Sequence, residues 1–341
     1  MNQTSKSLLF QENSLTFETL TLLHSKQNLL AFSAGVDSSA LFFLLLEHKI
    51  KFDIALVNYG LRKQSEEEEA YALALGKEYD LKVYVKKAPH FENNFEKNAR
   101  DFRYAFFDEL MLEEGYDNLL TAHQLNDQLE WFLMRLTKGA GVSELMGLEA
   151  YSRRKAYGLV RPLLAYSKEE LLEYLNTNNH KYFIDESNSD EKYERNYFRN
   201  EFANKLLEEY GEGIKASFEY LQEDKLLFSK GLKELLQEKE LYVIGYEDKA
   251  SIVRAVDKYL KKLGYLLSSA QRAELKKERS LVFGGVWAVE VNEDRIFIAP
   301  YRKSAMPKVF KEACRKLKIP SKIRSYLFEE EIELNALVKV L

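Results

Sequence analysis

The chain has 341 residues, of which 46% are hydrophobic and 30% are charged, and its formal net charge is −4. These values exclude a disordered or fibrous chain and indicate a globular protein of two or three domains. The slightly acidic balance argues against a protein that coats nucleic acid by charge alone. The single cysteine, Cys314, excludes an internal disulfide and chemistry that needs two thiols.

Neither a membrane span nor a secretory leader is predicted. The longest apolar run, Ala40 to Leu46, is too short to cross a bilayer. The polar opening MNQTSKSLLFQENS lacks a basic start followed by an apolar core. We therefore expect a cytoplasmic protein with no membrane partner.

Short apolar runs alternate with amphipathic stretches in the first part of the chain. Strands are expected at residues 29–32, 53–58, 82–85 and 118–122, and helices at 38–48, 66–79 and 95–114. This alternation predicts an α/β domain with a parallel, Rossmann-like sheet covered on both faces. Ligands of such sheets bind beyond the carboxyl ends of the strands.

The pattern changes after about residue 200. Residues 202–237 are charged and helix-rich without a strand signal, and two short helices are expected between 250 and 277. A β-hairpin is expected at 280–300, with its turn at the sequence NED. We therefore predict a catalytic domain at 1–205, a mostly helical linker and small domain at 206–300, and a basic tail at 301–341.

The tail is the most basic part of the chain. Between Arg302 and Arg324 there are nine basic residues and one acid, a local excess of eight positive charges. Such a run forms either a solvated helix face or a surface for RNA.

A strand-to-helix turn near the start of the chain predicts a phosphate site. Its six small or polar residues are Ser33, Ala34, Gly35, Val36, Asp37 and Ser38. Backbone N–H groups at such a helix start point outward and favour an anion, and small side chains let phosphate approach. The spacing of a Walker loop is absent, and the sequence GAGVSE lacks the last glycine of a dinucleotide fingerprint. An ordinary tight turn is the alternative.

The turn SAGVDS is similar to the S-G-G-x-D-S loop of the PP-loop ATP pyrophosphatases. The resemblance implies that these six residues bind ATP, which is split between its α- and β-phosphates so that AMP is transferred to a carbonyl oxygen. A carboxylate beside triphosphate needs a metal or a specific hydrogen bond, so Asp37 is assigned to Mg²⁺ as well as to catalysis. Ala34 departs from the family's glycine, which costs about 1 kcal/mol or more if that position needs positive φ.

Four further segments narrow the resemblance. In chain order they are VNYGLR (57–62), NNFEKNARDFRYAFF (93–107), TAHQLNDQLEWFLMRLTKGAGVSELMGL (121–148) and, after RPLLAYSKEEL, YFIDESNSDEKYERNYFRN (182–200). Together with the loop they resemble the tRNA(Ile)-lysidine synthetase family. The resemblance implies that ATP adenylates the wobble cytidine of isoleucine tRNA and that free lysine displaces AMP through its ε-amino group. It also implies an ATP site, a lysine pocket and a surface that holds RNA. Binding of tRNA is assigned to the small domain at 206–300, and the tail at 301–341 is expected to be either a solvated helix face or a reduced C-terminal tRNA-binding module.

The third segment supplies the predicted lysine pocket. Asp127 and Glu130 are three residues apart and share one face of a helix, with His123 at its head. Two carboxylates can hold an ammonium group, although a solvated helix face is the alternative. The opposite face is apolar and is expected to pack on the sheet through Leu129, Phe132, Leu133 and Leu136. Three positions depart from the family pattern: Gln124, Asn126 and Trp131.

Arginines are assigned to phosphate and RNA. Arg100 and Arg103 lie on a helix expected to face the ATP cleft, where the guanidinium fork suits phosphate. The resemblance assigns Arg195, Asn196 and Arg199 to tRNA, and Arg195 and Arg199 share a helix face. For Arg199, contact with the ATP side of the site is the alternative. A turn and helix start are expected just upstream, at Asp185, Ser187 and Asn188.

Two other interpretations stay open. One is a PP-loop ligase that acts on a small molecule, such as an ammonia-using synthetase. The other is a degenerate nucleotide- or RNA-binding protein, which the departures at Ala34 and Asn126 allow. A homodimer is left open as well.

Overall fold

The computed structural model describes residues 15–60, 63–154, 156–184 and 194–340. The chain forms two compact units, Met1–Leu221 and Gln222–Leu341. The boundary falls within helix α10 (Asn204–Lys230). The sequence suggested three segments, whereas the basic tail here belongs to the second unit. Among the described residues no helix is both long and apolar enough to cross a bilayer.

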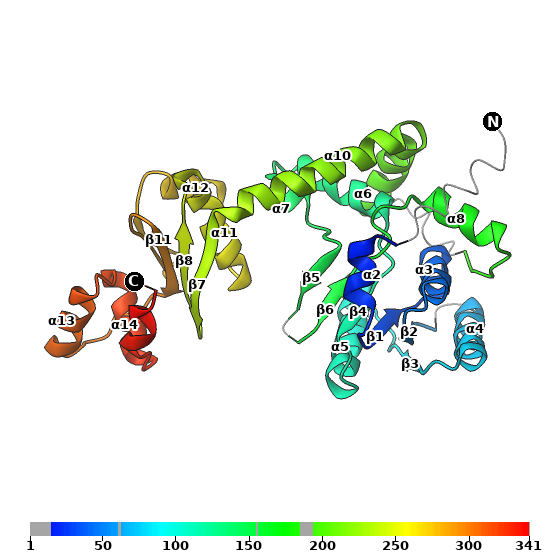
Figure 1. Ribbon diagram of the computed structural model, residues 1–341, viewed down its shortest axis with the longest axis horizontal. Coiled ribbons are helices and arrows are strands. Elements are labelled where there is room, and N and C mark those ends of the chain that lie inside the picture. Colours follow the sequence, from blue (N-terminus) through cyan, green and yellow to red (C-terminus); the bar gives the residue numbers. More distant parts are fainter. Residues whose placement is uncertain (1–14, 61–62, 155, 185–193, 341) are drawn as a thin grey trace. The chain divides into compact units, whose positions relative to one another are not determined.

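The first unit is built on a six-stranded sheet in the order β3-β2-β1-β4-β6-β5 (Figure 1). Its strands are β1 (Asn28–Ala31), β2 (Phe52–Asn58), β3 (Val83–Lys87), β4 (Asn118–Leu120), β5 (Tyr151–Arg153) and β6 (Gly158–Val160). All neighbouring pairs are parallel except β5 and β6. The parallel α/β layout and its four predicted strands are confirmed. The three-residue strands β5 and β6 are too short to give a periodic signal.

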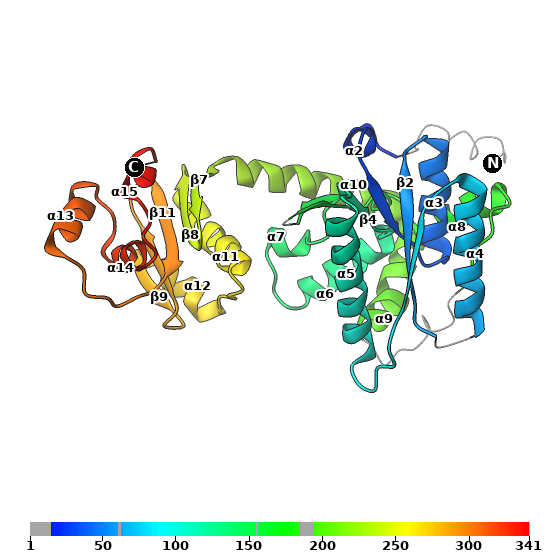
Figure 2. The same ribbon diagram turned by 90° about the horizontal axis from the view of Figure 1, so that it is seen from below.

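Helices cover both faces of this sheet (Figure 2). The helices of this part of the chain are α2 (Phe17–Leu23), α3 (Val36–Glu47), α4 (Lys63–Tyr79), α5 (Phe95–Glu113), α6 (Leu125–Leu136), α7 (Val142–Leu145), α8 (Lys168–Thr177), α9 (Glu194–Phe198), the π-helical segment η2 (Arg199–Ala203) and α10. Buried side chains of α3, α4 and α8 form one core, and those of α5 form another. The central helix α3 buries eight consecutive residues, which explains its nearly continuous apolar sequence.

The strand order places a crevice beside β1. Strands β2 and β3 follow one another on one side of β1, whereas β4 lies on its other side. The connections after β1 and β4 therefore diverge, and ligands of open α/β sheets bind at this point beyond the carboxyl ends of the strands. The phosphate loop follows β1, and His123 and α6 follow β4. The topology thus brings two of the predicted site segments together.

The second unit is a five-stranded antiparallel sheet in the order β7-β8-β11-β10-β9. Its strands are β7 (Leu232–Glu238), β8 (Leu241–Tyr246), β9 (Ser280–Phe283), β10 (Trp287–Val291) and β11 (Arg295–Pro300). Its helices are η3 (Lys249–Ser251), α11 (Ile252–Lys262), α12 (Ser269–Leu275), α13 (Lys308–Lys316), α14 (Ser321–Glu329) and α15 (Leu334–Val338). Helices α11 and α12 pack on one face of the sheet, and α13, α14 and α15 pack on the other.

The second unit contains more strands than we predicted from the sequence. The hairpin β10–β11 with its turn at NED is confirmed, as are the two short helices α11 and α12. The expectation of helix up to residue 237 is wrong, because β7 covers Leu232–Glu238. This edge strand carries Lys and Glu among its leucines, a composition that protects an exposed sheet edge and also favours helix.

Candidate active site

The phosphate loop folds as a nest at the start of α3. Gly35 is the N-cap residue, and the backbone N–H of Ser39 donates to its carbonyl at 2.9 Å. The hydroxyls of Ser33 and Ser38 lie 3.1 Å apart, and Ser38 Oγ accepts from the Ser33 backbone N–H at 3.2 Å. These contacts hold the first turn of α3 in a fixed shape. Its free N–H groups and the helix dipole favour an anion at this end.

Ala34, which stands where the family has glycine, adopts the left-handed backbone conformation. Its φ is 57°, and its side chain is fully buried. The Ala34 carbonyl accepts a hydrogen bond from the backbone N–H of Phe183 at 2.9 Å. This contact and the buried methyl group help to offset a strain of about 1–2 kcal/mol. The loop therefore keeps the geometry that glycine would give.

Asp37 is the acidic residue of the loop, and its carboxylate is only partly compensated by neighbouring groups. Its Oδ1 is buried and, in the described part of the chain, accepts no hydrogen bond. Burial, and after it the charge of Asp127, raise the pKa of Asp37 to about 7, although the charges of Lys168 and Arg199 oppose this rise in part. Such a carboxylate is suited to a cation, because a positive ligand would satisfy the buried oxygen.

Asp127 and Glu130 lie on the first turns of α6 and are both buried, with 8% and 2% of their surfaces exposed. The sequence folds this way because Gln124 caps the helix: its side chain accepts from the backbone N–H of Asn126. The Gln124 backbone N–H in turn donates to Asp127 Oδ2 at 3.1 Å. Gln124 and Asn126 depart from the family pattern, but they still form the N-terminal cap of the helix.

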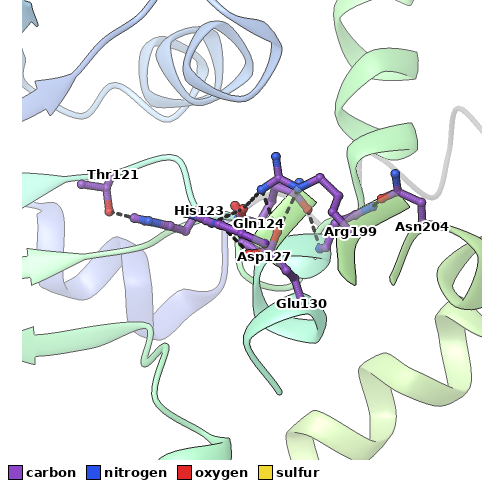
Figure 3. A network of polar contacts seen from close by, with 9 residues as sticks. Thr121, His123, Gln124, Asp127, Glu130, Arg199 and Asn204 are labelled. Carbon is purple, nitrogen blue, oxygen red and sulfur yellow. Dashed lines mark hydrogen bonds and ion pairs between the residues drawn. The ribbon is translucent and has the colours of Figure 1, made fainter. Parts of the chain in front are cut away.

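Two arginines from the neighbouring helical segment reach these carboxylates, and Figure 3 shows Arg199 beside Asp127 and Glu130. Arg199 Nη2 lies 2.8 Å from Asp127 Oδ1 and 2.9 Å from Glu130 Oε2. Arg195 Nη2 lies 3.0 Å from Asp127 Oδ1, and its Nε donates to Glu130 Oε1. We call these four residues the charge quartet. The structure therefore joins the predicted lysine-binding residues to two of the predicted tRNA-binding residues.

The quartet sets the protonation of its acids. Burial alone would raise the pKa of Asp127, but the charges of His123, Arg199 and Arg195 outweigh it and lower the pKa below the usual range. Burial raises the pKa of Glu130, and the two arginines compensate only partly. Since Asp127 also acts on the pKa of Asp37, the quartet lies within electrostatic reach of the phosphate loop.

His123 stands between β4 and α6, at the head of the helix as expected. Its Nδ1 lies 3.0 Å from the hydroxyl of Thr121. Burial lowers the pKa of His123 to about 4, and the charge of Asp127 only partly opposes this. The imidazole is therefore neutral near pH 7.

The apolar face of α6 does not pack on the sheet as expected. Leu129, Phe132 and Leu133 join a cluster with Leu207 and Phe218 of α10. Leu136, the fourth expected member, is 51% exposed. The apolar face of α6 thus packs against η2 and α10, while the first turns of α6 carry Asp127 and Glu130.

The other predicted site residues occupy distinct positions. Arg100 and Arg103 are exposed on the first half of α5, which follows β3 at the carboxyl edge of the sheet. Arg100 acts on the pKa of His123, and Arg103 on that of Tyr59. Asn196 is 8% exposed, so its side chain offers little surface to RNA.

Two basic residues were not assigned from the sequence. Lys168, at the start of α8, is one of the charges that oppose the raised pKa of Asp37. Arg161 is buried at 9% exposure, and its Nη1 donates to the Glu149 carbonyl at 2.7 Å. Both lie in the segment RPLLAYSKEEL (161–171), and their basic side chains were the feature of the sequence that could have identified them as site residues. Outside the described residues lie Asp185, Ser187, Asn188, Leu61 and Arg62.

Asp37 is the candidate ligand for a metal ion. Nowhere in the described ranges do three His, Cys, Asp or Glu side chains gather as a metal site. Mg²⁺ commonly uses one or two carboxylates together with substrate phosphates. The buried, unpaired Oδ1 of Asp37 beside a phosphate nest fits that pattern.

Comparison with known proteins agrees with this geometry. Residues 7–206 match the family described as the PP-loop domain. The chain is 45% identical to a tRNA(Ile)-lysidine synthase of Campylobacter jejuni, with 94% of this chain and 98% of that protein covered. It is 42% identical to the Wolinella succinogenes protein of the same name, with coverages of 91% and 95%.

A solved structure supports the fold. The U34-tRNA thiolase from Methanococcus maripaludis, described with a [4Fe-4S] cluster, matches 75% of this chain and 86% of its own at a TM-score of 0.52 and 21% identity. The nest, the topology and the relatives lead to one assignment. The chain is a PP-loop protein that belongs to the tRNA(Ile)-lysidine synthase family, a family of ligases.

Proposed function

We propose that the protein joins free lysine to the wobble cytidine of an isoleucine tRNA with a CAU anticodon. In the first step the cytosine carbonyl oxygen bonds to the α-phosphorus of ATP, and the bond to the β-phosphate oxygen breaks and releases pyrophosphate. In the second step the ε-amine of lysine bonds to the ring carbon, the carbon–oxygen bond breaks, and AMP leaves. Family membership and the electrostatic contact between the quartet and the phosphate loop carry the proposal.

The PP-loop domain indicates ATP use. The N–H groups at the start of α3 would hold phosphate, and Asp37 would hold Mg²⁺. When bound, the metal neutralises charge on the phosphates and on pyrophosphate as it leaves. Arg100, exposed at the carboxyl edge of the sheet, suits further contact with phosphate.

Asp127 and Glu130 are the proposed lysine site. Both acids already contact two guanidinium groups, so a lysine ammonium must displace one of them. Arg195 is expected to bind the two acids less tightly than Arg199, because 39% of the Arg195 side chain is exposed against 20% for Arg199. We expect Arg195 to leave and turn toward RNA phosphate. The neutral His123 would accept one N–H of the ammonium.

The basic tail is a second candidate RNA surface. Several of its charges are exposed on or near α13, including Lys308, Arg315 and Lys316. Others serve the fold: Arg324 donates to the Ile319 carbonyl at 2.8 Å, and Lys322 donates to the Ser280 carbonyl at 2.8 Å. We therefore assign RNA binding to the exposed set only.

The proposal is tested with purified protein, ATP, labelled lysine and transcripts of isoleucine and methionine tRNA that share the CAU anticodon. Lysine should enter the isoleucine transcript with one AMP released per lysine. Asp37→Asn should abolish AMP formation, while the exposed control Lys205→Ala should behave as wild type. Absence of lysine in the transcript would refute the proposal.

The arginine exchange has its own test. Glu130→Gln should raise the KM for lysine by at least about tenfold, since it removes one charge of the site. Arg195→Met should weaken tRNA binding without raising the KM for lysine. A raised lysine KM in Arg195→Met would mean that this arginine belongs to the pocket and does not leave.

Two other functions predict different results. A ligase that acts on a small molecule would release AMP at the same rate with and without tRNA. A degenerate binding protein would bind ATP and release no pyrophosphate. The family assignment makes the tRNA-dependent reaction the expected one.

A further inference from the structure

Three aromatic side chains form a cluster beside the charge quartet. Tyr197 and Phe198 end α9, and Phe202 lies in η2, with ring centroids 5.9, 5.6 and 5.7 Å apart. Tyr197 is 47% exposed and Phe202 is 41% exposed. Among the described residues, none of the three rings belongs to a buried hydrophobic cluster. We call these residues the aromatic cluster.

The backbone that carries the cluster is anchored at both ends. Arg195 and Arg199 are tied to the carboxylates of α6, and Ala203 is fully buried against α6 and α10. The segment between them winds as a π-helix from Arg199 to Ala203. π-Helical turns are rare and occur frequently at functional sites. The backbone that carries the rings is therefore fixed to the rest of the unit, while Tyr197 and Phe202 remain exposed.

We infer that the aromatic cluster is a stacking surface for an unpaired base of the anticodon loop next to the reacting cytidine. The inference rests on the proposed function, in which that cytidine leaves its stack to reach the phosphate loop. Single-stranded RNA is held by stacking bases on aromatic rings and by basic groups on its backbone. Tyr197 and Phe202 supply ring faces, and Arg195, exposed on the same helix, supplies the charge.

The experiment measures binding of a fluorescent anticodon stem-loop RNA by anisotropy over a range of salt concentrations. Replacing Tyr197 or Phe202 by Ala should raise the Kd by about 5- to 150-fold for one lost stack. The slope of log Kd against log salt should stay unchanged, because no charge is removed. Tyr197→Phe should restore binding, and Phe202→Leu should not, since leucine is apolar but cannot stack. The matched control is Tyr220→Ala, which removes a 68% exposed ring from α10.

The outcomes separate this inference from the proposed function. Loss of binding in both alanine variants, with ATP binding and melting temperature kept, supports the stacking surface even if no lysine is incorporated. Unchanged RNA binding in both alanine variants overturns it, even if the enzyme makes lysidine. Rescue by Phe202→Leu, or cluster-dependent self-association of the free protein by sedimentation, also overturns it, because either result means a plain hydrophobic contact.

Discussion

Replacing Asp37 by Asn should stabilise the protein while it removes activity. The pKa of Asp37 rises from 3.8 to about 7 on folding because the side chain is desolvated. The folded state therefore disfavours the ionised acid, and this penalty is absent at low pH. It grows as the pH rises from 3.8 toward 7 and is complete above 7. Asn has the same shape and no charge, so it escapes the penalty.

The size of the effect follows from the shift. A change from 3.8 to about 7 corresponds to about 4 kcal/mol at pH 8. Since the residue as a whole is only partly buried, water reduces this value. We expect Asp37→Asn to raise the free energy of unfolding by about 2–4 kcal/mol at pH 8 and by about 1 kcal/mol at pH 5.

Urea unfolding at both pH values, in EDTA and without nucleotide, measures this difference. Asp101→Asn on the exposed face of α5 is the matched control and should change the free energy by less than about 0.5 kcal/mol. Equal stabilities of wild type and Asp37→Asn at pH 8 would refute the desolvation of Asp37. So would a difference that does not depend on pH.

Other substitutions test the packing and the quartet by the same urea assay. Arg199→Met removes a guanidinium from two buried carboxylates and should lower the free energy of unfolding by about 3 kcal/mol. The control Lys205→Ala removes an exposed ion pair and should lower it by less than about 0.5 kcal/mol. Similar losses in the two variants would mean that the quartet is solvated. Gly76→Ala would put a Cβ 2.2 Å from Val83 Cγ2 and should destabilise by about 1–3 kcal/mol. Gly213→Ala in α10, beyond the kink at Tyr210, meets nothing within 4 Å and should stabilise by up to about 1 kcal/mol, so a loss there would contradict the helical geometry.

The parallel sheet was predictable because its strands are buried on both faces. Such strands read as apolar runs between helical patterns, and β1 and β2 have this character. The turn of the phosphate loop was predictable from its small residues. The positive φ of Ala34 was predictable because the family has glycine at this position. These features are local, so the sequence carries them directly.

The second sheet was harder to predict because its edge strand is charged. Residues 232–238 read LKELLQE, which has good helix formers at nearly every position. Pairing with β8 overrides this propensity, since β8 is almost fully buried and needs partners on both sides. Tertiary pairing of this kind leaves no trace in a window of a few residues.

Helical spacing correctly put Asp127 with Glu130 on one face and Arg195 with Arg199 on another, but it does not show that the two pairs meet. Only the fold brings the two faces into contact, with four ion pairs between them. Two buried carboxylates cannot lose both arginines without becoming protonated or exposed. The proposed lysine site and the helix proposed to meet RNA are therefore one electrostatic unit. A ligand that moves an arginine on α9 must change the affinity of the acids on α6 for a cation.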